Sequence, residues 1–185
     1  IERSPIRTML DSAARFPDAI HLEIGQPDFP TPAHIIEAAV RAARHEYTGY
    51  TANAGMQELR EAATVKLARE NAMQVSPDEV IVTIGAMEAV FASMAVLLDP
   101  GDEVLLPDPG YGNFNMAARI LNSVCRIYPT LADQGFAPDF DALESLVGPR
   151  TKAMLINSPS NPTGAVYPEA VLRECLAFFQ RHDLY

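Results

Sequence analysis

Short apolar runs alternate with amphipathic stretches along the second half of the chain. Consecutive apolar residues occupy most of positions 80–83, 103–106, 124–128 and 153–157, as is typical of strands buried on both faces of a sheet. Apolar residues recur at helical spacing over 86–98, 113–121, 139–147 and 168–182. Strands separated by helices predict an α/β fold, with a mostly parallel central sheet and helices on both of its faces.

For two of these predicted helices, the sequence also predicts which residues are buried. The 86–98 helix is apolar on nearly every face, so we expect it to be buried. In the 168–182 helix the inward face is predicted to contain Val171, Leu172, Cys175, Leu176 and Phe179.

The first part of the chain follows a different pattern. Residues 1–30 contain several prolines and no sustained helical period, so we interpret them as an N-terminal arm or part of a small domain. A helix capped by Thr31 is predicted from Pro32 onward, and a second one with Leu59, Ala62, Ala63 and Leu67 inward. Residues 31–185 are predicted to form a large domain that is incomplete, because the chain stops after a helix where another strand is due.

Composition narrows the classes of partner. The chain has 185 residues, 48% hydrophobic content and a formal net charge of −10, and its lysines and arginines form no cluster. We therefore expect neither nucleic acid nor a membrane as a partner. No residue is assigned to a metal site. No leader segment is recognisable, and Cys125 and Cys175 are predicted to be buried reduced thiols, so a cytoplasmic location is expected.

A rigid loop follows the last predicted strand. Residues 157–164 read Asn-Ser-Pro-Ser-Asn-Pro-Thr-Gly, in which two prolines exclude helix before them and Gly164 permits a turn. The loop presents the Asn161 amide at the carboxyl end of a strand, where open α/β sheets bind ligands. Taken alone, it is equally compatible with a simple chain reversal.

Two further segments end at the same predicted edge. At 83–88 a strand passes through Gly85 straight into a helix, whose first N–H groups and dipole suit a phosphate. At 107–114 a Pro- and Gly-rich loop carries Tyr111, whose ring can stack on a flat heteroaromatic ring. Alone, the first is also compatible with an ordinary turn and the second with a core tyrosine. Together with Asn161, they suit a planar ring that carries a phosphate, such as pyridoxal 5'-phosphate (PLP).

In these segments the chain resembles the N-terminal half of class I/II aminotransferases, the fold-type-I PLP enzymes that include aspartate aminotransferase. The resemblance rests on a series of motifs in order: Gly25-Gln26-Pro27-Asp28, Tyr50 through Gly55 to Glu58-Leu59-Arg60, Gly85-Ala86, Pro100-Gly101-Asp102, Pro109-Gly110-Tyr111 and Asn161-Pro162-Thr163-Gly164. It implies a homodimeric enzyme that transfers an amino group between an amino acid and a 2-oxo acid.

The resemblance also implies roles for individual residues. Gly85, Ala86 and Met87 are expected to hold the cofactor phosphate, Tyr111 to stack on the pyridine ring, and Asn161 to donate to the ring's phenolic oxygen. Gly25 and Asn161 are expected to bind the substrate, with the Gly25 backbone approaching its carboxylate. Tyr50 is expected to reach the partner subunit's phosphate. Cis peptide bonds are expected before Pro109 and Pro162. Relatives often have a polar side chain where Met87 stands, so the phosphate here is expected to depend on backbone donors.

No catalytic residue is assigned within the chain. Its two lysines, Lys66 and Lys152, fall on a polar helix side and at a strand start, so we interpret both as solvated. The Schiff-base lysine, the aspartate that pairs with the pyridine nitrogen and the arginine that binds the substrate carboxylate are expected after Tyr185. Three alternatives remain open: a PLP-dependent C–S lyase or decarboxylase on this fold, a non-catalytic PLP-binding regulatory domain, and a natural inactive fragment.

Overall fold

The computed structural model describes residues 5–22, 24–45 and 47–185. It divides into two compact units, which are described separately: unit 1 contains Ile1–Ser12 and Gly85–Tyr185, and unit 2 contains Ala13–Ile84. The predicted division into an arm over 1–30 and a domain over 31–185 stays a prediction.

Unit 1 is built on a parallel sheet, as predicted. Strand β1 (Glu103–Asp108) lies in the centre, between β2 (Val124–Pro129) and β3 (Thr151–Met154), and both neighbours run parallel to it. In register, Val104 lies beside Cys125 on one side and Ala153 on the other. The final residue continues this pattern, because the Tyr185 N–H donates to the Lys152 carbonyl and the Met154 N–H to the Tyr185 carbonyl, at 3.0 and 2.9 Å.

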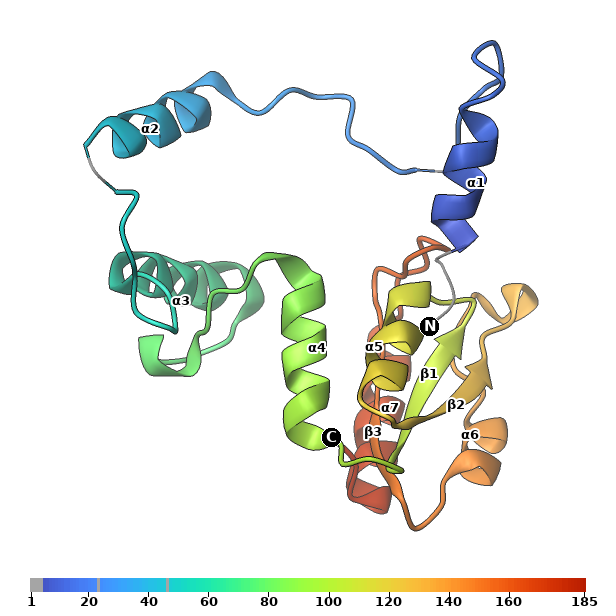
Figure 1. The fold of residues 1–185 in the computed structure, drawn as a ribbon. Helices are drawn as coiled ribbons and strands as arrows, with labels where there is room; N and C mark the ends of the chain where they lie inside the picture. Colours follow the sequence, from blue (N-terminus) through green and yellow to red (C-terminus); the bar gives the residue numbers. More distant parts are fainter. Residues whose placement is uncertain (1–4, 23, 46) are drawn as a thin grey trace. The chain divides into compact units, whose positions relative to one another are not determined.

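Helices flank the sheet of unit 1 (Figure 1). Alternate residues of β1 point to opposite faces, so Val104 and Leu106 enter one apolar cluster and Leu105 the other. The first cluster joins β1 to α4 (Gly85–Leu97) and α5 (Gly112–Ile120), and the second joins it to α6 (Phe140–Leu146) and α7 (Glu169–His182). A short 3-10 turn, η2 (Ala132–Gln134), precedes α6, which Asp139 caps by accepting from the Ala142 N–H at 3.0 Å. The predicted α/β fold with helices on both faces is confirmed.

Two predictions about residues 80–98 are wrong. Residues 80–83, at the end of unit 2, form no strand in the part of the chain that the structure describes, and the Val82 N–H donates to the Ala54 carbonyl at 3.0 Å. Helix α4 is present, but it is not buried: Met94 is its one buried residue, and Val96 is 85% exposed. One face of α4 packs on the cluster around Val104.

The inward face of α7 also differs from the prediction. Cys175 and Phe178 are its buried residues, whereas Leu172 and Leu176 are 41% and 54% exposed. Phe178 contacts the α6 side of the core through Phe140, with the ring centroids 6.0 Å apart. The helical period alone does not determine, to better than about one residue, which side of α7 faces the sheet. In the structure Phe178 packs in the core cluster with residues of the sheet.

Unit 2 contains α2 (Ala33–Arg44), α3 (Gln57–Asn71) and the 3-10 turn η1 (Pro77–Glu79). Helix α2 begins one residue later than predicted, with Pro32 at the N-cap and no side-chain cap from Thr31. In α3 the predicted inward residues Leu59 and Ala62 are exposed, and Arg60 is the buried one.

Residues 1–30, in which the sequence shows no sustained helical period, contain a helix. Helix α1 (Pro5–Ala13) starts at a proline, which a first helical turn tolerates, and Ile6, Met9 and Leu10 recur at helical spacing over too short a length to stand out. None of the helices in the described ranges is long and apolar enough to cross a membrane.

Candidate functional site

Three of the predicted cofactor-binding segments belong to unit 1 and converge toward one edge of its sheet. Because β1 and β3 are parallel, the loops after Asp108 and Met154 leave from the same edge. Figure 1 shows α4 running in the opposite direction to β1, so that its first turn lies toward this carboxyl edge. The edge therefore collects the turn at Gly85, the loop that carries Tyr111 and the loop that carries Asn161.

The turn at Gly85 has the geometry expected of an anion site. Gly85 adopts φ +76°, a conformation that disfavours side chains, and apart from its chain neighbours and its own helix backbone no atom lies within 4 Å of the position that a Cβ would take. Ala86 and Met87 follow in the first turn of α4, whose N–H groups have no carbonyl partner within the helix. The Met87 side chain packs against the cluster around Met94 and Val104, so only its backbone faces the helix start.

The loop after β1 holds Tyr111 from two sides. The tyrosine is the N-cap of α5, its hydroxyl accepts a hydrogen bond from Asn113 Nδ2 at 2.8 Å, and its ring meets Phe114 edge-on at 5.5 Å. The bond before Pro109 is cis, as expected. Tyr111 also lines a cavity of about 310 Å³, together with Leu106, Pro107, Asp108, Gly110, Gly112, Phe114, Asn115 and Ile127. Tyr111 is half-buried. Its exposure is intermediate between those of an open stacking ring and a core tyrosine, the two roles that its sequence position allows.

The loop after β3 is fixed by its own backbone and side chains. Asn157 Oδ1 accepts from the Asn161 N–H at 2.8 Å, and Asn157 Nδ2 donates to the Pro159 carbonyl at 3.1 Å. Gly164 adopts φ +73° and donates to the Ser160 carbonyl at 2.8 Å. The peptide bond before Pro162 is cis, as expected, and so is the one before Pro159. Asn161 is exposed, and its side-chain amide has no hydrogen-bond partner in the part of the chain that the structure describes.

The remaining predicted site residues lie in unit 2. Gly25 is exposed with nothing within 4 Å of a would-be Cβ, and Tyr50 is fully exposed in a loop that lines a shallow pocket. Lys66 is exposed and donates to Asn71 Oδ1 at 2.7 Å, and Lys152 is exposed near the start of β3. Both lysines therefore occupy solvated positions, as expected.

The charged network of unit 1 lies at the opposite edge of the sheet. Glu103, the first residue of β1, is 3% exposed, accepts from Arg126 Nη2 at 2.6 Å and from Thr151 Oγ1 at 3.0 Å. The hydrogen bond from Arg126, reinforced by Thr151, lowers the pKa of the Glu103 carboxyl, although burial acts against it. This group supports the strands and is remote from the loops that carry the candidate site.

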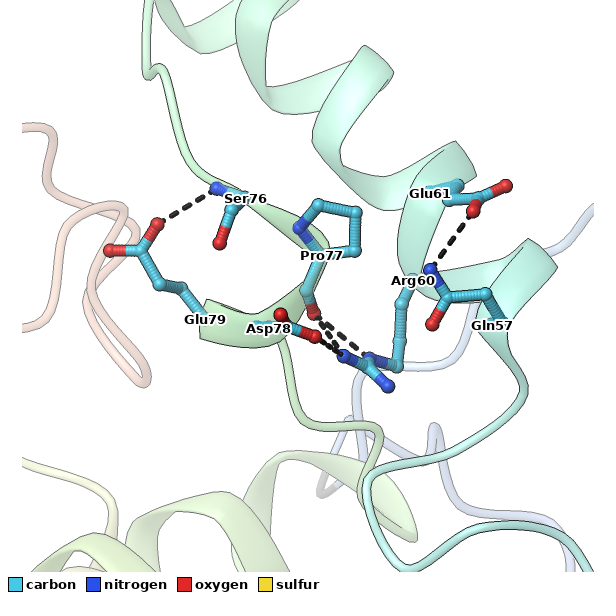
Figure 2. Close-up of polar contacts among 7 residues, drawn as sticks. All are labelled: Gln57, Arg60, Glu61, Ser76, Pro77, Asp78 and Glu79. Atoms are coloured by element: carbon cyan, nitrogen blue, oxygen red, sulfur yellow. Dashed lines mark hydrogen bonds and ion pairs between the residues drawn. The ribbon is translucent and has the colours of Figure 1, made fainter.

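Two supporting residues were missed from the sequence. Asn113 contacts Tyr111, and Arg60 is buried against η1 (Figure 2). Arg60 belongs to the Glu58-Leu59-Arg60 motif, but a helical arginine gives no hydropathy signal for burial, and only its place in a recurring motif could have pointed to it.

Comparison with known proteins shows which family the sequence resembles. The sequence profile of the aminotransferase class I and II family matches residues 17–185 of this chain. A probable aspartate/prephenate aminotransferase of Thermus aquaticus is 44% identical over 168 residues, covering 91% of this chain and 44% of the relative. The chain thus spans about half the length of the curated relatives it matches.

Solved structures agree with the sequence comparison. The aspartate aminotransferase of Thermus thermophilus with maleate superposes with a TM-score of 0.94 and 39% identity, covering 100% of this chain and 50% of that one. An alanine aminotransferase of Pyrococcus furiosus gives a TM-score of 0.93 at 32% identity, covering 98% of this chain and 48% of that one. The chain belongs to the class I and II aminotransferase family.

Proposed function

We propose that the protein is a PLP-dependent aminotransferase and that these residues form its cofactor-binding part. The observation that carries the proposal is the convergence of three loops at the carboxyl edge of the parallel sheet of unit 1, where α/β proteins bind ligands. Each loop offers a different kind of contact: backbone donors at Gly85, an aromatic ring at Tyr111 and an exposed amide at Asn161.

The residues present fit PLP. A phosphate suits the first turn of α4, where Gly85 leaves open space and the N–H groups of Ala86 and Met87 add to the helix dipole. Tyr111 offers a ring that is held in place by Asn113 and Phe114, and Asn161 offers a donor for the phenolic oxygen. Because the Met87 side chain packs on the core, the phosphate in this protein would depend on backbone donors.

When bound, PLP supplies an electron sink that lets an amino acid lose its Cα proton. The residues of this chain would bind and orient the cofactor: Tyr111 would cover one face of the ring and Asn161 would donate to its phenolic oxygen. By family resemblance, the Gly25 backbone would approach the substrate carboxylate. Lys66 and Lys152 are solvated, so the lysine that moves the proton would come from outside residues 1–185.

The proposal extends to a cytoplasmic homodimer. Tyr50 is fully exposed, as a residue that reaches a partner subunit's phosphate must be before assembly. Cys125 and Cys175 are free thiols, as a reducing compartment favours.

Amino transfer is favoured over elimination or decarboxylation because the relatives described above are named aminotransferases. Their names make aspartate the first amino donor to test and alanine the second. The acceptor would be a 2-oxo acid.

Borohydride reduction tests the proposal. Reduction of the full-length protein with bound PLP, followed by peptide mass spectrometry, is expected to attach the cofactor to one lysine outside residues 1–185. A parallel assay compares oxo-acid-dependent amino transfer from aspartate with release of pyruvate and ammonia. Attachment to Lys66 or Lys152, or no attachment at all, would contradict the proposed site, and ammonia release without transfer would identify a lyase.

A further inference from the structure

The loop that carries Asn161 leaves the sheet of unit 1 from a fixed point. Just after β3, the Leu155 N–H donates to the Leu105 carbonyl at 2.9 Å, and the Leu155 carbonyl accepts from the Tyr128 hydroxyl at 2.8 Å. Leu105 in β1 and Tyr128 in β2 are both fully buried. The backbone is therefore held by two strands of the core only two residues before Asn157.

The Asn157 side chain uses both ends of its amide on the backbone of this loop. Its Oδ1 accepts from the Asn161 N–H at 2.8 Å, and its Nδ2 donates to the Pro159 carbonyl at 3.1 Å. One side chain thus bonds to the backbone on both sides of Ser160. Asparagine suits this position because its amide offers an acceptor and a donor, whereas an ionised aspartate offers acceptors only.

The bond from Asn161 is made by its own backbone N–H. It therefore holds the peptide plane that immediately precedes the Asn161 Cα, and this plane helps to set the direction in which the side chain leaves the loop. Pro162, on the other side, has a restricted φ but no N–H with which to form a second bond. Asn161 is exposed, so its direction depends on its backbone more than on packing in the core.

Other bonds hold the residues around Asn161. The Ser160 N–H donates to the Ala165 carbonyl, and the Tyr167 N–H donates to Ser158 Oγ, both at 2.8 Å. We propose that Asn157 is a positioning residue for Asn161: it connects the fixed end of β3 to the amide that would donate to the phenolic oxygen of PLP. The inference rests on the proposed PLP function, and it assigns Asn157 no contact with the cofactor.

The test compares two ligands that differ by the phenolic oxygen. Apo full-length protein is titrated with PLP and with 3-deoxypyridoxal 5'-phosphate, which keeps the ring and the phosphate, and the affinities are read by fluorescence. Asn157→Ala removes both bonds to the loop. It is expected to weaken PLP binding by about three- to tenfold, because a misdirected donor loses much of a charge-assisted hydrogen bond. Binding of the deoxy analogue is expected to change by less than about twofold.

A double-mutant cycle tests whether Asn157 acts through Asn161. Asn161→Ala alone is expected to weaken PLP binding by about tenfold. Adding Asn157→Ala to that variant is expected to cause no further loss, because both substitutions remove the same contact. Hydrogen exchange of the apo protein gives a readout without any ligand: Asn157→Ala is expected to speed exchange in the peptide that contains Asn161 and to leave β1 unchanged.

Val166→Ala is the matched control, because Val166 follows in the same connection and is 68% exposed. It is expected to leave both affinities and the exchange of the loop unchanged. Asn157→Ser keeps a short polar side chain that can accept from the Asn161 N–H. It is expected to lose less PLP affinity than Asn157→Ala, and it serves where the alanine variant does not fold.

The outcomes separate the inference from the proposed function. If the wild-type protein binds PLP and the Asn157 variants bind it equally well, the inference is wrong and the proposed function stands. An equal loss for PLP and its deoxy analogue, a full further loss in the Asn161→Ala background, or failure of both Asn157 variants to fold would also overturn it, since each indicates a general structural role. Absence of PLP binding by the wild-type protein would overturn the proposed function, and the inference with it.

Discussion

An added methyl group at Gly110 would overlap the Pro107 carbonyl oxygen. No side chain can be accommodated there unless the loop that carries Tyr111 moves. Gly112, two residues later at the start of α5, has nothing within 4 Å of the same position. The two glycines therefore make a matched pair within one loop.

We expect Gly110→Ala to lower the free energy of unfolding of the full-length protein by about 1–3 kcal/mol, as overpacking does. Gly112→Ala is expected to be neutral or slightly stabilising, because it restricts the unfolded chain at a helical position. Urea unfolding followed by circular dichroism measures both. Equal effects of the two substitutions would contradict a steric role for Gly110.

Two substitutions of Tyr111 distinguish the contribution of its ring from that of its hydroxyl. Tyr111→Phe removes the hydrogen bond from Asn113 and keeps the ring, so it is expected to cost about 1 kcal/mol of stability and to leave PLP affinity nearly unchanged. Tyr111→Leu removes the aromatic face, and a loss of about tenfold in PLP affinity is expected from the stacking energy. Fluorescence titration of the apo protein gives both affinities. A larger loss for phenylalanine than for leucine would show that the hydroxyl, and not the ring, matters.

At the scale of elements, the start of β1 depends on a buried carboxylate. Glu103 joins β2 through Arg126 and β3 through Thr151, so one side chain links the three strands. Because its pKa is lowered in the folded state, its contribution to stability is fully present above the pKa of the unfolded chain, about 4.3. The contribution is lost as the pH falls through the lower, folded-state pKa.

Glu103→Gln should therefore matter most near neutral pH. Arg126 is half-exposed, so the pair is screened, and we expect a destabilisation of about 1 kcal/mol at pH 7. The difference between wild type and variant is expected to shrink as the pH falls below about 4, where the wild-type carboxyl becomes protonated. Thermal unfolding from pH 7 to pH 3 checks this. A difference that is constant with pH would attribute the effect to packing.

The elements of unit 1 were largely predictable, because each gives a local signal. Apolar runs located β1, β2 and β3, and apolar residues at helical spacing over 139–147 located α6. Pairing is not local, and residues 80–83 resemble a strand in sequence although no described neighbour completes a ladder. The orientation of a helix face is equally non-local, which is why Phe178 was missed on α7.

The residues of the candidate site also divide into those with a local sequence signal and those whose placement depends on distant residues. That Tyr111 and Asn161 lie in loops after strands, and Gly85 at a helix start, could be predicted because turn-forming residues are visible in the sequence, although no strand precedes Gly85; their roles in binding stay predictions. Arg60 could not, since its burial depends on the Pro77 carbonyl seventeen residues away. Tyr50 and Gly25 were singled out by family resemblance, and their roles stay predictions.

At the scale of the whole molecule, two apolar surfaces remain uncovered by the described residues. On α2, Ile35 and Ile36 are 50% exposed and Val40 is 43% exposed. On α4, Val96 is 85% exposed. Exposed apolar surface is a site of association, and the relatives that this chain matches are about twice its length.

These surfaces predict a difference between residues 1–185 produced alone and the full-length protein. The formal charge of −10 opposes association at pH 7, and it disappears near the sequence pI of about 4.8. We therefore expect residues 1–185 alone to bind a hydrophobic dye strongly at pH 7 and to associate increasingly as the pH falls toward 5. Light scattering and dye fluorescence against pH measure both effects. Val96→Glu, on the exposed side of α4, is expected to reduce both in the shorter protein. If the substitution has no effect there, the surface that drives association lies elsewhere, and α2 becomes the candidate.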